Sequence, residues 1–318
     1  MAAVKRVAPP EVTVVAYPEK EVPSHWKRKF LLFISALRSD HLLIDFNFSD
    51  VALFSLGLFL FPFHRCRITT LDFFVRDPSE KTKPFVSWAL SRVSRFLVYF
   101  RDSSRLQALF RLPASKFCFV PFKINGYEII RSLTPRDEGY VFSGGRSRRD
   151  FATFFQAVEP SGYPVKLFTG DSSALAPHGS SLEGLTIPPN VEILNTESSA
   201  QAFLRTMAGA RIVVIPLLRD SHTQAGIGVY IQAMALRKCV IISASLGVSD
   251  VLTEGQAAIV PAGDPSALRQ AIEKLWNDDA LREQYAEAGF RYASALGGED
   301  DLARRLLNQL PQPAVSAP

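Results

Sequence analysis

Cysteine is scarce in this chain, and long hydrophobic runs are missing. Of 318 residues, only Cys66, Cys118 and Cys239 carry a thiol, and they lie far apart in apolar surroundings. This spacing offers no paired metal ligands and indicates free, buried thiols in a reducing compartment. The strongest apolar run, from Val51 to Phe63, is too short to cross a bilayer, and we expect a buried helix there.

Motifs of several enzyme classes are also absent. The sequence has no His-Glu-x-x-His, no Cys-x-x-Cys, no phosphate-binding loop that ends in Gly-Lys-Ser, and no Ser-His-Asp order. The carboxylate pairs Asp278-Asp279 and Asp300-Asp301 lie next to helical stretches, with no strand leading into them. We interpret both pairs as solvated surface, and we expect neither a metal nor a cofactor.

The composition is that of a globular protein. Hydrophobic residues make up 47% and charged residues 21%, and the length allows two domains, each with its own core. The net charge of +5 favours anionic partners. Because the basic residues are dispersed, without the aromatic and basic sheet pattern of an RNA-binding module, we expect no nucleic acid. The N-terminus has no long apolar core, so we expect no signal peptide and a cytoplasmic protein.

The stretch from Gln224 to Ser243 organises the chain. It begins with a predicted helix in which Ile227 starts an apolar face, while Gly226 and Gly228 leave the start of the helix without bulky side chains. The exposed N–H groups and the dipole of such a helix start suit a diphosphate. Gln232 lies one turn further on the same side, where its amide would reach a sugar or ribose hydroxyl.

A second phosphate-binding element is predicted after the strand at 140–142. The turn Gly144-Gly145 allows the backbone to approach phosphate oxygens closely, and the guanidiniums of Arg146 and Arg149 can neutralise them. The sequence therefore predicts that this turn and the helix start at Gly226 hold the same diphosphate.

These segments, with "GVSDVL" at 247–252 and "AAIVPAGDPSALRQAIEKLW" at 257–276, resemble the donor-binding half of retaining GT-B glycosyltransferases of the family-4 type, the glycosyl transferases of group 1. The resemblance implies an α/β fold of two Rossmann-like domains that face a cleft. A short or divergent acceptor-side domain is expected over 1–136, a nucleotide-sugar-binding domain over 137–295, and a terminal helix and tail over 296–318.

The resemblance also implies an activity. A sugar would move from a nucleotide-sugar donor to an acceptor, without a metal and with retention of configuration, as in polysaccharide biosynthesis. The acceptor stays open between a glycan, a lipid-linked molecule and a small molecule. Arg146 and Arg149 would hold the donor diphosphate, and Gln224 and Gln232 occupy the places of two glutamates that the family usually carries.

Three further positions follow from the resemblance. Asp72, after the predicted strand at 66–71, would contact the transferred sugar, although an ordinary loop or capping aspartate is the alternative. The turn Asn195-Thr196 would meet the nucleobase. The backbone of Gly226, Ile227 and Gly228 would meet the donor.

An alternative function is a non-catalytic nucleotide-sugar-binding or scaffold protein on a degenerate GT-B fold. The two glutamines favour it, because an amide lacks the charge that strengthens a hydrogen bond. So does the segment at 17–20, which replaces the family's glycine-rich turn after a predicted first strand, Val12 to Ala16.

An aromatic and basic helix is predicted near the N-terminus. Its apolar positions are Trp26, Phe30, Phe33, Ile34 and Leu37, and its flanking basic residues are Lys27, Arg28, Lys29 and Arg38. Packing on the sheet is one interpretation. The other is peripheral contact with the anionic inner face of a membrane.

Overall fold

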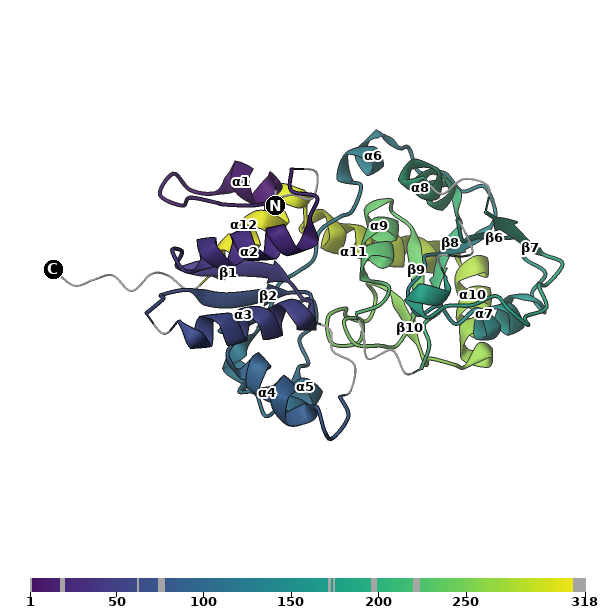
Figure 1. Ribbon diagram of the computed structural model, residues 1–318. Coiled ribbons are helices and arrows are strands. Elements are labelled where there is room, and N and C mark those ends of the chain that lie inside the picture. The colour runs from purple at the N-terminus through teal and green to yellow at the C-terminus, as the bar shows by residue number, and fades with distance from the viewer. Residues whose placement is uncertain are drawn as a thin grey trace. The chain divides into compact units, whose positions relative to one another are not determined.

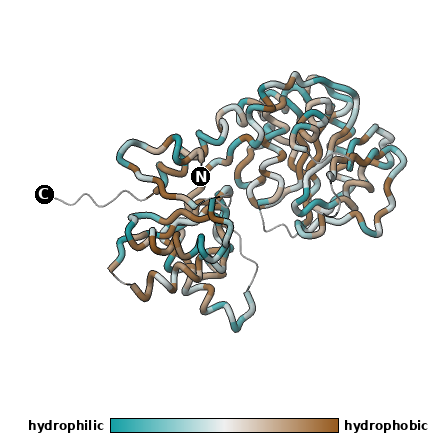
Figure 2. Tube along the Cα trace, turned by 45° about the horizontal axis from the view of Figure 1, so that its top comes forward, coloured by the Kyte–Doolittle hydropathy of each residue, from teal (hydrophilic) through white to brown (hydrophobic). Residues whose placement is uncertain are grey.

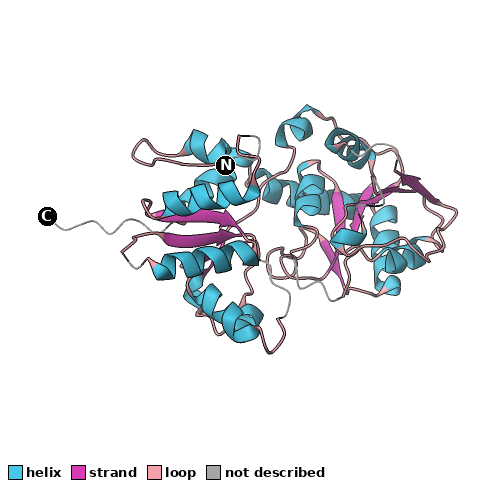
Figure 3. Ribbon diagram, viewed as in Figure 1, coloured by secondary structure: helices cyan, strands magenta, loops and turns pink. Residues whose placement is uncertain are grey.

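The computed structural model describes residues 2–17, 21–61, 63–73, 78–170, 173, 175–195, 199–219 and 224–310. The chain forms two compact units, coloured along the chain in Figure 1. Unit 1 comprises the chain up to Pro121 together with the C-terminal part from Leu302, and unit 2 comprises Phe122–Asp301. Each unit consists of strands with helices packed around them (Figure 3), and hydrophobic stretches, brown in Figure 2, occur in both.

Unit 1 is built on a four-stranded parallel sheet. The strands lie in the order of the chain: β1 (His41–Asp45), β2 (Arg67–Leu71), β3 (Arg95–Val98) and β4 (Phe117–Phe119). The helices of this unit are α1 (Ala2–Val7), α2 (His25–Ala36), α3 (Phe48–Leu60), α4 (Lys83–Ser91), α5 (Ser104–Phe110), the short η1 (Ala114–Lys116), and α12 (Glu299–Asn308) from Leu302 onward.

The helix predicted from the apolar run at Val51 is confirmed as α3. Asn47 caps it by accepting a hydrogen bond from the N–H of Ser49 at 3.0 Å. Only one face of α3 is buried, including Val51 and Phe54, whereas Leu60 on the other side is 64% exposed. None of the described helices is both long and apolar enough to cross a membrane.

The predicted first strand, Val12 to Ala16, is wrong. This segment has no regular structure, and Val12 and Val15 are 40% and 49% exposed. The sheet of unit 1 ends at β1, which pairs with β2, and the segment does not join it as a further strand. The residues that replace the expected glycine turn, 18–20, lie outside the described part of the chain.

Unit 2 is built on a six-stranded parallel sheet. Its strands are β5 (Val141–Gly144), β6 (Val165–Phe168), β7 (Val191–Leu194), β8 (Ile212–Ile215), β9 (Cys239–Ser243) and β10 (Ala258–Val260). Its helices are α6 (Tyr127–Ser132), α7 (Phe151–Val158), η3 (Ala176–His178), α8 (Ala200–Gly209), α9 (Ile227–Ala235), α10 (Pro265–Asn277) and α11 (Asp279–Ser294).

The strand order of unit 2 marks a place for a ligand. The order is β10-β9-β8-β5-β6-β7, so the chain leaves the centre in one direction after β5 and in the other after β8. Ligands of open parallel sheets bind outside the carboxyl ends of the strands at such a switch point. Every residue of β8 and β9 is buried, as expected of strands covered on both faces.

The boundary between the units differs from the one predicted at 136/137. Helix α6 and the segment after it belong to unit 2. The N–H groups of Arg136 and Glu138 donate to the carbonyls of Ala208 and Gly209 at 2.9 Å, and the Lys238 ammonium donates to the Arg136 carbonyl at 2.6 Å. These bonds fix the predicted linker to the end of α8.

Candidate functional site

The turn after β5 needs its two glycines for different reasons. A Cβ on Gly144 would lie 2.8 Å from Cε2 of Phe203 and 3.1 Å from the carbonyl oxygen of Phe168, so packing excludes a side chain there. Gly145 has a φ of +95°, which disfavours other residues, and a Cβ on it would overlap the guanidinium of Arg149. The guanidinium therefore lies directly against the turn.

Arg149 is a buried cation with no carboxylate partner among the described residues. Its side chain is only 3% exposed. Its Nε donates to the Gly144 carbonyl at 2.9 Å and its Nη1 to the Ser147 carbonyl at 2.7 Å. Burial lowers the pKa of Arg149 to about 10. Because a buried charge is costly without a counter-charge, this position favours an anion.

The loop that carries Arg149 is fixed at the switch point. The Asp150 N–H donates to the Pro216 carbonyl at 3.1 Å, which ties the loop after β5 to the segment after β8. Ser180 supports the same loop: its hydroxyl accepts the Arg149 N–H at 2.7 Å and donates to the Arg146 carbonyl at 2.5 Å. The role of Ser180 is not predicted from the sequence, because nothing in a long Ser-, Pro- and Gly-rich loop marks one serine as structural.

Helix α9 begins without a side-chain cap. Its N-cap is Gly226, in the left-handed conformation with a φ of +88°. The other long helices of the sheet do have caps, which are Asp150 for α7, Ser199 for α8, Asp264 for α10 and Asp278 for α11. Gly226 has no side chain and so does not offer the first N–H groups of α9 the acceptor that these caps offer to their helices.

The two halves of the predicted phosphate site meet at Gly145. A Cβ there would lie against the Arg149 guanidinium and 3.2 Å from Cγ2 of Val229, in the first turn of α9. A Cβ on Gly226 would instead point at Ile215 and Ile242, at 3.3 and 3.4 Å. Gly226 thus serves the turn and the packing of α9 on the sheet rather than leaving the surface open.

Arg146 and Arg148 differ from Arg149 in their surroundings. Arg146 is exposed, and its guanidinium makes no hydrogen bond or ion pair within the described residues. Arg148 is half-buried, and its side chain lies against Gly179, where a Cβ would be 3.1 Å from Cδ. Of the three arginines, only Arg149 is buried against the turn, and the phosphate contact of Arg146 stays a prediction.

Gln232 has a partner that the sequence analysis did not foresee. Its Nε2 donates to the carbonyl of Asn125 at 3.1 Å. The Asn125 side chain also lies at the start of α9, because a Cβ on Gly228 would be 3.0 Å from its Nδ2. The Asn125-Gly126 pair, a common turn signal, was the available hint. Contact of Gln232 with a ribose hydroxyl stays a prediction, as does the role of Gln224, which is half-buried in the turn before α9.

The remaining predicted residues lie at strand ends. Asp72 directly follows β2 in unit 1, is exposed, and has a φ of +59°, which aspartate tolerates better than most residues. Its N–H donates to the Leu97 carbonyl at 3.1 Å. Asn195 is exposed directly after β7 in unit 2, and Thr196 lies outside the described residues. The binding roles of these residues stay predictions.

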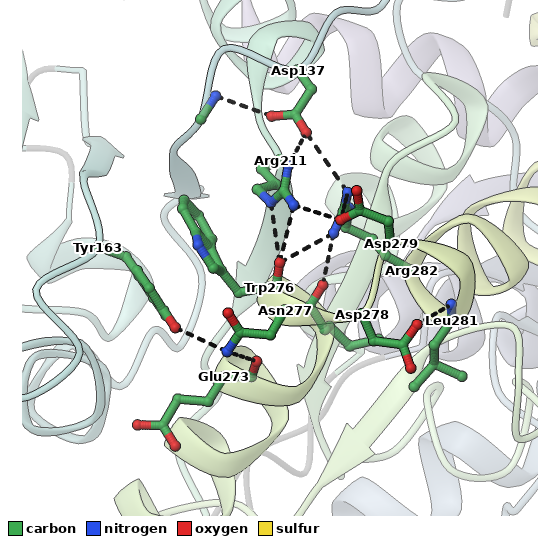
Figure 4. A network of polar contacts seen from close by, with 12 residues as sticks. Asp137, Tyr163, Arg211, Glu273, Trp276, Asn277, Asp278, Asp279, Leu281 and Arg282 are labelled. Atoms are coloured by element: carbon green, nitrogen blue, oxygen red, sulfur yellow. Dashed lines mark hydrogen bonds and ion pairs between the residues drawn. The ribbon is translucent and has the colours of Figure 1, made fainter.

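Asp278 and Asp279 are exposed, as their interpretation as solvated surface predicts, and both also have structural partners. Asp278 caps α11, and Asp279 pairs with Arg211 at 2.6 Å and with Arg282 at 2.8 Å. Figure 4 shows both arginines between Asp279 and Asp137. In the part of the chain that the structure describes, no group of three or more His, Cys, Asp or Glu side chains is arranged to hold a metal ion.

Part of the chain is similar to known glycosyltransferases in sequence. Residues 167–278 match the family model of the glycosyl transferases of group 1. Over 140 residues, the chain is 33% identical to the capsular polysaccharide biosynthesis glycosyltransferase CapM of Staphylococcus aureus. This match covers 42% of the chain and 34% of CapM, so it spans about a third of the length of that relative.

Solved glycosyltransferase structures share the fold over nearly the whole chain. A glycosyltransferase from Rickettsia africae ESF-5 superposes with a TM-score of 0.68 at 12% identity, covering 94% of this chain and 83% of that one. Anabaena Alr3699/HepE, solved in complex with UDP and glucose, gives a TM-score of 0.65 at 13% identity, with 94% and 84% covered. The predicted GT-B fold is thereby confirmed. Residues 167–278 thus carry the pattern of the group 1 glycosyl transferases, on a fold that the chain shares with solved glycosyltransferases.

Proposed function

We propose that this chain is a glycosyltransferase that uses a nucleotide-sugar donor, does not need a metal, and retains the configuration of the transferred sugar. The observation that carries the proposal is Arg149, a buried cation that lies at the switch point against the uncapped start of α9. The acceptor is a glycan, a lipid-linked molecule or a small molecule.

The chemistry of donor cleavage explains why such a site is useful. When the bond between the sugar and the diphosphate breaks, negative charge develops on the leaving oxygen and positive charge on the sugar ring. A guanidinium and N–H groups that are already oriented stabilise the leaving diphosphate. Arg149 and the first turn of α9 supply these groups from unit 2. The leaving phosphate itself can accept the proton of the acceptor hydroxyl.

The family match at 167–278 and the ligands bound in similar solved structures support the choice of donor. HepE was solved with UDP and glucose, and an E. coli trehalose-6-phosphate protein was solved with UDP-2-fluoro glucose, with a TM-score of 0.66 at 13% identity to this chain. By analogy we propose a nucleoside diphosphate sugar here, with the diphosphate against Arg149.

The test is a titration of the full chain with UDP, GDP and ADP, followed by the corresponding sugars. We expect at least one diphosphate to raise the unfolding temperature, because a ligand that binds only the folded state stabilises it. Arg149→Met should lower the affinity for that diphosphate at least about tenfold, because one charge-assisted hydrogen-bonding group is lost. Without ligand, the free energy of unfolding of the variant should differ from that of the wild type by only about 2 kcal/mol. Removing the buried charge is favourable and offsets the loss of its hydrogen bonds.

Arg205→Met is the matched control, because Arg205 is an exposed arginine of α8 in the same unit. It should bind the diphosphate as the wild type does. If Arg149→Met is folded and binds equally well, the proposed site is wrong. Turnover is measured separately, as transfer or hydrolysis of the sugar of the donor that binds.

A non-catalytic nucleotide-sugar-binding protein is the second candidate, and the glutamine at 224 favours it. Diphosphate binding without transfer or hydrolysis of any UDP-, GDP- or ADP-sugar would support this candidate. Gln224→Glu then separates the two functions. A gain of transfer from none indicates a lost activity, whereas a loss of existing transfer indicates an enzyme adapted to glutamine.

A further inference from the structure

A hollow of about 280 Å³ opens in unit 1 at the amino ends of the strands. Cys66 lies directly before β2, Ser94 directly before β3, and Lys116 directly before β4, and all three line it. Asp72, by contrast, follows the carboxyl end of β2. The hollow is therefore at the edge of the sheet opposite to the one where ligands of parallel sheets usually bind.

The lining of this basic hollow includes His64, Arg92 and Lys116 and no carboxylate. The Lys116 ammonium donates to the carbonyls of Ser91 and Val93, at 2.5 and 2.6 Å. Burial, and secondarily the charge of Arg92, lowers the pKa of Lys116. Arg92 makes no ion pair, and Nδ1 of His64 is buried without a hydrogen-bond partner, within the described residues. Two neighbouring cations and an unused imidazole nitrogen suit a phosphate group.

Exposed apolar side chains lie next to the basic hollow. The Arg92 guanidinium sits 5.4 Å from the centre of the Phe59 ring, and Phe59 in turn contacts Trp88. We call the exposed apolar residues of α3, the segment after it, and α4 the aromatic rim. Its members are Leu53, Leu56, Phe59, Leu60, Phe61, Phe63 and Phe85, which are 40 to 99% exposed.

Helix α2 extends the rim. The Phe33 ring contacts the Phe61 ring and fills the space over Gly57, where a Cβ would lie 2.6 Å from it, so α2 lies alongside α3. Trp26 and Phe30 of the same helix are 73% and 63% exposed. The stripe predicted from the sequence thus divides into a packed part and an exposed part.

We propose that the basic hollow and the aromatic rim dock unit 1 on a bilayer that contains anionic phospholipid, with a headgroup phosphate in the hollow and the rim in the interfacial layer. Aromatic and basic side chains on one face match the two components of such a surface. A free phosphate is a less suitable occupant, because it would leave the aromatic rim exposed to water. A second copy of the chain is also less suitable, because it would bring two basic hollows together in one interface.

The test is flotation of the full chain with vesicles of phosphatidylcholine alone and of phosphatidylcholine mixed with phosphatidylglycerol. We expect binding to the mixed vesicles only, and weaker binding at high salt. Each basic residue near such a surface contributes about 1 kcal/mol, which is about fivefold in affinity. Arg92→Glu removes one positive charge and adds a negative one, so it should weaken binding at least about tenfold. Phe63→Asp should weaken it as much, because it puts a charge where an aromatic ring would enter the interfacial layer. Phe63 is 99% exposed, so we expect the variant to fold.

The controls are Arg291→Glu and Ile187→Asp, at exposed positions of unit 2. Both should bind as the wild type does, and all four variants should keep its unfolding temperature. The proposal fails if the chain does not prefer anionic vesicles, if Arg92→Glu binds normally, or if the controls lose as much binding. If the chain does not bind vesicles and Phe63→Asp dissociates a dimer, the rim is an interface between copies and the proposal fails. If the chain does not bind vesicles and inorganic phosphate stabilises the wild type but not Arg92→Glu, the hollow binds free phosphate and the proposal fails.

Discussion

Lys238 is a buried lysine in unit 2 that is bonded to backbone only. Its ammonium donates to the carbonyls of Arg136 and Ala210, at 2.6 and 2.8 Å, and its side chain is 6% exposed. Burial lowers its pKa from 10.5 to about 8, against a smaller opposing effect of Asp137 and Glu138. Between these two pH values the unfolded chain binds more protons than the folded chain, so this group adds stability as pH rises.

We therefore expect the wild type to gain stability relative to Lys238→Met as pH rises from about 8 to about 10.5. The full effect is about 3 kcal/mol, from about 1.4 kcal/mol for each unit of pKa difference. Urea unfolding of both proteins across this range measures it. A difference between the two proteins that stays constant with pH would mean that Lys238 has a normal pKa in the folded state.

At the scale of elements, Arg211 joins the predicted linker to two helices. Its guanidinium pairs with Asp137 and Asp279, donates to the Trp276 carbonyl at 3.0 Å, and lies 5.2 Å from the centre of the Trp276 ring. Figure 4 shows this residue at the centre of the cluster. The cluster holds the segment before β5 to the junction of α10 and α11.

Arg211→Met should lower the unfolding free energy of unit 2 by about 1 to 2 kcal/mol, the value of a partly buried network rather than of one surface pair. Arg131→Met is the comparison, because the Arg131 side chain is 66% exposed and its one ion pair is 3.9 Å long. Thermal unfolding should distinguish the two variants. Equal stability would show that the Arg211 contacts contribute no net free energy.

At the scale of the whole molecule, the end of the chain completes unit 1. Leu302, Ala303 and Leu306 of α12 are buried, and the Gln309 carbonyl accepts a hydrogen bond from Arg95 at 2.5 Å. Removing the chain after Asp301 should therefore destabilise unit 1 by several kcal/mol, at about 25 cal/mol for each Å² of lost apolar burial.

Unit 2 of this truncated chain should unfold as in the full chain, and nucleoside diphosphates should still stabilise it. Limited proteolysis with mapping of the cut sites separates the two units. If the truncated chain is cut first within 122–301, the division of the chain is different from the one described.

Much of this fold could be predicted from the sequence, because buried parallel strands and glycine turns leave local patterns. The strands at 141 and 239, and the capped helix at Asp264-Pro265, are examples. The packed position of Arg149 could not be predicted, because burial of a guanidinium depends on the loop after β8, which is distant in sequence. Nor could the absence of the first strand, because whether a short apolar run forms a strand depends on its packing against the rest of the fold.

The hydrogen bond of Gln232 to Asn125 has one more consequence. A glutamate at 232 would turn a carboxylate oxygen toward the Asn125 carbonyl, so that two acceptors would face each other where a donor and an acceptor now meet. The amide is thus required by the polypeptide that enters unit 2. Glutamine at this position is matched to its own surroundings, and Gln232→Glu should lose this hydrogen bond.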